Sequence, residues 1–118
     1  MSDGSTMATN RIQVIGSDSF NAKVLVAEGR MAVEFMSYGC GYCRAIEPVL
    51  QRVAEMISHD ETIFRVDITA DPQLASTYDI GGTPTFIMFE NGEELARVEG
   101  PDPDLASVLA AVTGPFVL

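Results

Sequence analysis

The chain has 118 residues, of which 47% are hydrophobic, and this suffices for one domain with its own core. Its 17 acidic and 7 basic residues give a net charge of -10, which argues against nucleic acid or a membrane surface as partner. No apolar run is long enough to span a membrane, and residues 1–10 lack the features of a secretory signal. We therefore expect a flexible tail over residues 1–10, a folded domain over residues 11–118, and a cytoplasmic monomer.

The first half of the chain predicts two strand–helix pairs. A short strand over residues 12–15 precedes a helix that ends at Gly29. The mostly apolar run over residues 31–36 is typical of a strand covered on both faces. Apolar side chains at three- and four-residue steps predict a helix over residues 44–57, in which Pro48 is expected to cause a kink because it lacks a backbone donor.

The second half adds two more helices and a hairpin. A β-rich run over residues 62–68 is followed by a short helix that opens at Asp71-Pro72. The apolar strand over residues 86–89 turns back at Asn91-Gly92, and a last helix is expected over residues 103–112. The order β-α-β-α-β-α-β-β-α predicts an α/β fold with a mixed sheet of four to five strands and helices on both faces.

Both cysteines lie in one turn, Cys40-Gly41-Tyr42-Cys43, between a buried strand and a helix. A helix N-terminus offers unpaired N–H groups and partial positive charge, which favour the thiolate that attacks disulfides. We expect Cys40, at the exposed edge of the turn, to be the nucleophile. Cys43, one turn inward, would resolve the mixed disulfide.

Three other interpretations of this cysteine pair remain open. A structural zinc site needs four ligands, whereas the chain has two cysteines and the single His59, to which we assign no role. Two inert buried thiols do not suit a glycine-flanked turn. Metal trafficking would predict tight Cu(I) or zinc binding. We expect no metal and no cofactor beyond the redox pair itself.

Around this turn the sequence resembles the thioredoxin family, over about residues 18–114. The motifs that carry the resemblance are Val33-Glu34-Phe35, Cys40-Gly41-Tyr42-Cys43, Pro48, Thr83-Pro84-Thr85, Asn91-Gly92 and Gly100. The resemblance implies a thioredoxin fold and a cis Thr83–Pro84 bond that lies against the cysteines. Such a bond makes a rigid turn on which an extended substrate could pair as an added strand. The implied substrate groove comprises Tyr38, Gly39, Gly41, Tyr42, Ile80, Gly82, Thr83 and Gly100.

The acidic residue within the buried strand also has an implied role. Because side chains alternate along a strand, Glu34 faces away from Val33 and Phe35. It stands where thioredoxins usually carry an aspartate, beneath the cysteine pair, and Arg65 matches the family's usual lysine partner. Burial raises the pKa of a carboxyl group, so Glu34 could exchange a proton with Cys43. The alternative is an ion-paired acid without a catalytic part.

The chain departs from the family's usual pattern at several positions. Gly39 and Met36 stand where tryptophans are common, Glu99 replaces an apolar residue of the groove, and Tyr42 replaces the proline between the cysteines. The extra N–H group of Tyr42 favours the thiolate form and should raise the reduction potential. Glutaredoxins carry a tyrosine at the same place in their motif.

We therefore expect a protein-disulfide reductase that is less reducing than ordinary thioredoxin, with Cys40, Cys43, Glu34 and Pro84 as its catalytic residues. Its implied partners are disulfide-containing proteins and a thioredoxin reductase or another electron donor. The alternatives are glutaredoxin-like or isomerase activity, or a non-catalytic binding module with the same fold.

Overall fold

The computed structural model describes residues 12–57 and 62–114, and its elements confirm the predicted order. They are β1 (Ile12–Val14), α2 (Ser17–Phe20), η1 (Asn21–Leu25), β2 (Arg30–Met36), α3 (Gly41–Ile57), β3 (Thr62–Asp67), α4 (Pro72–Thr77), β4 (Thr85–Glu90), β5 (Glu93–Glu99) and α5 (Leu105–Thr113). Residues 1–10 and His59 lie outside the described residues, so the predictions made for them are not addressed.

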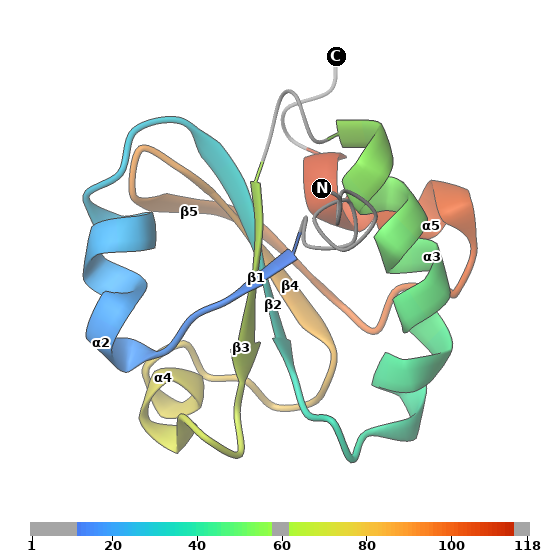
Figure 1. Cartoon of the computed structure of the whole chain (residues 1–118), viewed down its shortest axis with the longest axis horizontal. Helices are drawn as coiled ribbons and strands as arrows, with labels where there is room; N and C mark the ends of the chain where they lie inside the picture. Colours follow the sequence, from blue (N-terminus) through green and yellow to red (C-terminus); the bar gives the residue numbers. More distant parts are fainter. Residues whose placement is uncertain (1–11, 58–61, 115–118) are drawn as a thin grey trace, which may run out of the picture.

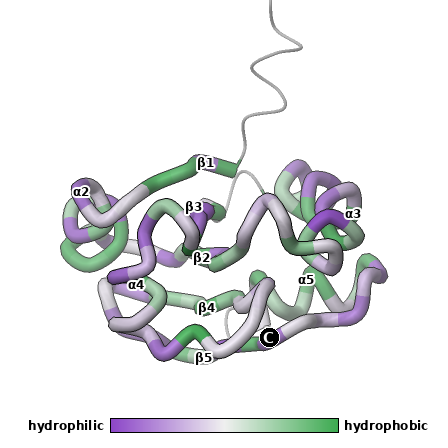
Figure 2. Tube along the Cα trace, turned by 90° about the horizontal axis from the view of Figure 1, so that it is seen from below, coloured by the Kyte–Doolittle hydropathy of each residue, from purple (hydrophilic) through white to green (hydrophobic). Residues whose placement is uncertain are grey.

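One mixed sheet of five strands, in the order β1-β3-β2-β4-β5, forms the centre of the molecule (Figures 1 and 2). The first three strands in this order are parallel, and β4 and β5 run antiparallel to their neighbours. α2 and α4 lie on one face of the sheet, and α3 and α5 lie on the other (Figure 1). The predicted α/β class and the helices on both faces are therefore confirmed.

Each face of the sheet has its own hydrophobic core. Between the sheet and helices α3 and α5, the buried residues include Ile46, Leu50 and Val108. On the face of α2 and α4, the core includes Phe20, Phe35 and Phe89. The two cores share the central strand β2, whose residues from Met31 onward are all buried. This strand supplies side chains to both faces and ends next to the cysteine turn.

The hairpin between β4 and β5 has the geometry that its sequence predicts. Asn91 and Gly92 both adopt positive φ, 52° and 85°, as a two-residue turn of this kind requires. The amide of Gly29 donates to the side-chain oxygen of Asn91, and Asn91 N–H donates back to the Gly29 carbonyl. A Cβ at Gly92 would lie 2.1 Å from the Leu25 carbonyl oxygen. Gly29 therefore fastens the hairpin to the chain ahead of β2.

Three predicted boundaries differ from the structure. The first helix continues as one π-helical segment and ends at Leu25, so Gly29 does not end it. The last helix begins at Leu105, and Asp104 caps it by accepting a hydrogen bond from Ser107 N–H. Pro103 thus precedes the cap. α3 runs without a break through Pro48 and begins at Gly41, three residues before the predicted start.

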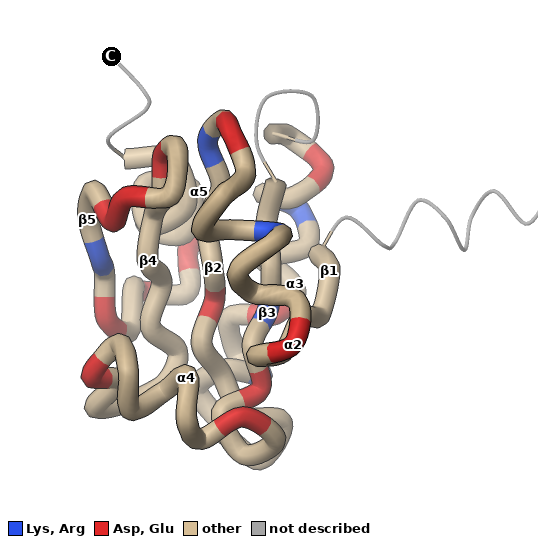
Figure 3. The backbone as a smooth tube through the Cα atoms, turned by 90° about the vertical axis from the view of Figure 1, so that its left-hand side faces the viewer, with Lys and Arg blue, Asp and Glu red and all other residues tan. Residues whose placement is uncertain are grey.

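The two edge strands, β1 and β5, differ in length and charge. β1 has three residues, whereas β5 has seven, among them Glu93, Glu94 and Glu99 (Figure 3). Within the described residues, no helix is long and apolar enough to cross a membrane.

Candidate active site

The cysteine turn joins the end of β2 to the start of α3. Cys40 N–H donates to the Ser37 carbonyl at 3.0 Å, and the Cys40 carbonyl accepts from Arg44 N–H, so Cys40 directly precedes the helix. Its sulfur accepts a hydrogen bond from Cys43 N–H at 3.1 Å. Both cysteines are free thiols. The helix start therefore presents a backbone donor to the Cys40 sulfur, as the sequence predicts.

The two sulfurs have opposite environments. Cys40 is partly exposed, whereas Cys43 is 2% exposed. Burial alone would raise the pKa of Cys40, but hydrogen bonds from Cys43, Thr83 and the Tyr42 backbone hold it below its usual value. Burial, together with the neighbouring Cys40, raises the pKa of the Cys43 thiol to about 11. The outer cysteine is thus the better thiolate, and the inner one keeps its proton.

The Thr83–Pro84 peptide bond is cis, as the resemblance implies. The Cys40 thiol donates to the Thr83 carbonyl at 3.5 Å, which places this turn against the nucleophile. The Pro84 carbonyl accepts from Gly100 N–H at 2.9 Å, and the Thr85 hydroxyl donates to the Gly82 carbonyl at 2.7 Å. The turn is therefore held from both sides next to Cys40.

Tyr42 joins the cysteine turn to the segment after β5. Its hydroxyl donates to the Pro101 carbonyl at 2.8 Å. A Cβ at Gly100 would lie 3.5 Å from the Tyr42 ring, so the ring rests close to that glycine. The structure thus brings Thr83 and Gly100, which are remote in sequence, next to Cys40 and Tyr42 of the cysteine turn.

The other predicted groove residues are more scattered. Gly39, Gly41 and Gly82 are exposed, whereas Ile80 packs partly against the core of the α2 and α4 face. Tyr38 is 54% exposed and lines a cavity on the far side of Cys43, beside Arg65. A groove role for these five residues remains a prediction.

Glu34 is completely buried on the α3 face of the sheet. Arg65, opposite it on β3, donates from Nε to Glu34 Oε1 at 2.8 Å, so the expected partner is present. Burial raises the pKa of Glu34, while the positive charge of Arg65 opposes this rise. The second carboxylate oxygen, Oε2, has no hydrogen-bond partner, which leaves one buried polar atom free for a further contact.

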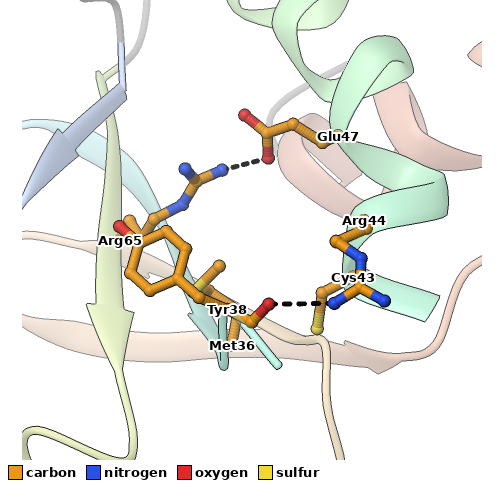
Figure 4. Close-up of a pocket in the computed structure, with 6 residues that line it drawn as sticks. All are labelled: Met36, Tyr38, Cys43, Arg44, Glu47 and Arg65. Carbon is orange, nitrogen blue, oxygen red and sulfur yellow. Dashed lines mark hydrogen bonds and ion pairs between the residues drawn. The ribbon is translucent and has the colours of Figure 1, made fainter. Parts of the chain in front are cut away.

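Sequence reasoning missed a second acid in this cluster. Arg65 also donates from its other end to Glu47 on α3, at 2.5 Å, and Gln51 Nε2 donates to the second Glu47 oxygen at 2.8 Å. Figure 4 shows Glu47 and Cys43 on the same helix, with Glu47 next to the Arg65 guanidinium and Cys43 across the cavity from it. The signal was the spacing, because residues four apart in a helix share a face and Glu47 follows Cys43 by four positions.

A cavity of about 220 Å³ opens between Cys43 and this ion cluster. Its walls are formed by Met36, Tyr38, Cys43, Arg44, Glu47 and Arg65 (Figure 4). Arg44 donates to the Tyr38 carbonyl at 3.1 Å and closes one side. Among residues 12–57 and 62–114, no group of three or more His, Cys, Asp or Glu side chains could hold a metal ion.

Comparison with known proteins identifies the family. The thioredoxin family model matches residues 11–111. The thioredoxin of Chlamydia pneumoniae is 35% identical over 89 residues, which cover 75% of this chain and 84% of that protein. The thioredoxin of the fungus Malassezia sympodialis is 30% identical over 103 residues, covering 86% of this chain and 96% of that protein.

A solved structure agrees with these sequence matches. The crystal structure of Malassezia sympodialis thioredoxin superimposes with a TM-score of 0.74 at 28% identity, covering 85% of this chain and 86% of that one. The predicted thioredoxin fold is therefore confirmed. With its Cys-x-x-Cys turn at the start of α3 and a cis-proline beside it, the chain belongs to the thioredoxin family of thiol–disulfide oxidoreductases.

Proposed function

We propose that the protein reduces disulfide bonds in protein substrates with the Cys40–Cys43 dithiol. The observation that carries this proposal is the difference between the two sulfurs, one partly exposed with a lowered pKa and the other buried with a raised pKa. An exposed thiol with a lowered pKa suits the nucleophile, Cys40. A buried thiol with a raised pKa suits the resolving residue, Cys43, which reacts only after the mixed disulfide has formed.

The reaction proceeds in two exchanges. The Cys40 thiolate attacks one substrate sulfur, so that a Cys40–substrate disulfide forms and the substrate's own S–S bond breaks, releasing a thiolate. Cys43 then loses its proton to Glu34 and attacks the Cys40 sulfur. The Cys40–Cys43 disulfide forms as the second substrate thiolate leaves. The substrate gains two electrons and the dithiol loses two.

The substrate docks as an extended segment beside the cis Thr83–Pro84 turn. The support is the 3.5 Å contact between the Cys40 thiol and the Thr83 carbonyl, which places backbone groups of this turn next to the reacting sulfur. Gly100, tied to Pro84, forms the opposite wall with Tyr42. A thioredoxin reductase or glutathione would return the disulfide to the dithiol.

We also propose that this dithiol is less reducing than that of ordinary thioredoxin. The backbone N–H of Tyr42 is among the groups that lower the pKa of Cys40, and a proline at this position could not donate. Stabilising the thiolate stabilises the reduced form and raises the potential. Equilibration in glutathione buffers should give a value above the roughly −270 mV of thioredoxin. A value of about −200 mV or higher would favour the glutaredoxin-like or isomerase alternative.

Trapping of the mixed disulfide tests the main proposal. With a disulfide-bonded substrate protein, Cys43→Ser should accumulate a covalent complex that dithiothreitol releases, because the resolving thiol is missing. Cys40→Ser should form none. If Cys40→Ser binds the same substrate and keeps the biological activity, the protein is a binding module and the reductase proposal is wrong.

A further inference from the structure

Arg65 lies between two carboxylates of very different exposure. Glu34, on β2, is completely buried, whereas the side chain of Glu47, on α3, is 33% exposed. The guanidinium donates to both, from Nε to Glu34 and from its terminal nitrogen to Glu47. The positive charge of Arg65 is therefore shared by two carboxylates. Of these two, Glu34 is buried and Glu47 is in partial contact with solvent.

Glu47 is held in this position by its own helix. Gln51, one turn further along α3, donates to the Glu47 oxygen that does not contact Arg65. Both oxygens of Glu47 are thus engaged, one by Gln51 and one by Arg65. Cys43 stands one turn before Glu47, and both line the cavity of about 220 Å³ beside Arg65 (Figure 4).

We propose that Glu47 is a positioning residue for the resolving step, which shares Arg65 with Glu34 and thereby keeps Glu34 able to take up the proton of Cys43. This inference rests on the proposed function. Glu47 itself contacts no reacting sulfur. It acts through Arg65, and the step remains the one written above, in which the Cys43 proton moves to Glu34 and the Cys43 sulfur bonds to Cys40.

Electrostatics gives the direction of the effect. A carboxylate that had Arg65 to itself would be stabilised as an anion and would be a weak base. Burial is the main cause that raises the pKa of Glu34, and the like charge of Glu47, which also shares the guanidinium of Arg65, raises it further. The free Oε2 of Glu34 then provides the atom that accepts the proton.

The other groups around Glu34 and Arg65 do not repeat this effect. On the neighbouring strand β4, the residue paired with Glu34 is the apolar Phe86. From α3 and the loop before it, the charged or titratable groups that line the cavity are Cys43, Arg44 and Tyr38, besides Glu47 itself. Within the described residues, Glu47 is the one carboxylate besides Glu34 that pairs with Arg65.

A two-phase kinetic experiment tests the proposal. A symmetrical aromatic disulfide that releases a coloured thiolate is mixed rapidly with the reduced protein: the first thiolate reports attack by Cys40, and the second reports resolution by Cys43. Each phase is followed against pH for the wild type, Glu47→Gln, Glu47→Asp and Glu28→Gln. Glu28 is an exposed acid in the loop before β2, so its variant is a control for net charge.

In Glu47→Gln, the acid limb of the second phase should move to lower pH by about half a unit or more, because Glu34 then ionises more easily. The first phase should keep its pH profile. Glu28→Gln should match the wild type in both phases, and Glu47→Asp should lie between the wild type and Glu47→Gln. An unchanged pH profile of the second phase in Glu47→Gln would overturn the proposal for Glu47. If the wild type shows neither phase, the proposed function is wrong instead.

A direct titration covers the case in which the variants react too slowly. The carboxyl ¹³C signal of Glu34, followed by NMR against pH in Cys40→Ser and in Cys40→Ser/Glu47→Gln, requires folding but no turnover. The midpoint should be lower in the double variant. Equal midpoints would refute a role for Glu47.

Discussion

The two faces of the sheet use the same strands for different purposes. On the face of α2 and α4, four aromatic rings pack together, with Tyr78 at 5.5 Å from Phe20, 5.8 Å from Phe35 and 5.9 Å from Phe89 between ring centroids. On the opposite face, an otherwise apolar core contains the buried acid Glu34 and its arginine. Successive side chains of β2 point to opposite faces of the sheet. Phe35 therefore packs among the aromatic rings, while its neighbour Glu34 lies on the face of the ion pair.

The largest expected effect comes from breaking the aromatic face. Phe89 is 1% exposed and contacts Tyr78 and Phe20. Phe89→Ala should lower the free energy of unfolding by about 3–5 kcal/mol, because it leaves a cavity among these rings. Urea unfolding measures the loss. If the faces are separate as described, the pH at which Cys40 reacts with iodoacetamide stays unchanged in the folded variant, and a shift would contradict that separation.

A smaller effect, of opposite sign, is expected on the other face. The pKa of Glu34 is raised in the folded protein from its ordinary 4.5, so its contribution to stability is complete below pH 4.5 and is lost as the pH rises through the folded-state value. Glu34→Gln removes this loss and leaves Arg65 paired with Glu47. The variant should be more stable than the wild type by about 1 kcal/mol at pH 8, since no carboxylate charge is then buried on β2 and the buried Arg65 keeps Glu47 as its partner.

Urea unfolding at pH 8 and at pH 4 checks this second prediction. The difference between Glu34→Gln and the wild type should shrink at pH 4, where Glu34 is mostly protonated in both the folded and the unfolded state. Glu28→Gln changes an exposed acid and should show no such dependence on pH. A Glu34→Gln variant that is less stable at pH 8 would mean that its carboxylate stabilises the fold as an ordinary ion pair.

The smallest expected effect concerns the hydrogen bond between the cysteine turn and the segment after β5. Tyr42→Phe removes the hydroxyl that donates to the Pro101 carbonyl, and it should cost about 0.5–1 kcal/mol of stability. Tyr38→Phe, which alters a half-exposed ring, should change stability by less than about 0.5 kcal/mol. Equal values for the two variants in urea unfolding would show that the hydroxyl of Tyr42 contributes nothing to stability.

Most of the fold could be predicted because its local signals agree with one another. The period of apolar residues gave α3, and the Asn91-Gly92 pair gave the hairpin. The helix boundaries were less predictable. Gly29 has the positive φ typical of a helix end, yet its partner is Asn91, which is remote in sequence. The residues around Gly29 do not show whether it ends a helix or pairs with a remote hairpin.

The site was predictable as far as motifs and alternation reach. The cysteine pair, the cis-proline and the inward-facing Glu34 all follow from a few neighbouring residues or from the resemblance. Glu47 was missed because its partner, Arg65, is 18 residues away on another element. Helical spacing places Glu47 and Cys43 on one face of α3. Only the packing of α3 against β3 shows that Arg65 lies within hydrogen-bonding distance of Glu47.

The acidic edge strand β5 has a further consequence for the protein at high concentration. An edge strand offers unpaired backbone groups on which another chain can add a strand, which is the first step of sheet-to-sheet aggregation. β5 carries the acids Glu93, Glu94 and Glu99 against the single base Arg97, which pairs with Glu94, so two copies that met along β5 would bring together an excess of negative charge. The opposite edge, β1, has only three residues within the described part of the chain, and those three offer little length for an added strand. If substrates pair with the backbone at the cis-proline turn as proposed, the described borders of the sheet discourage the same pairing between copies.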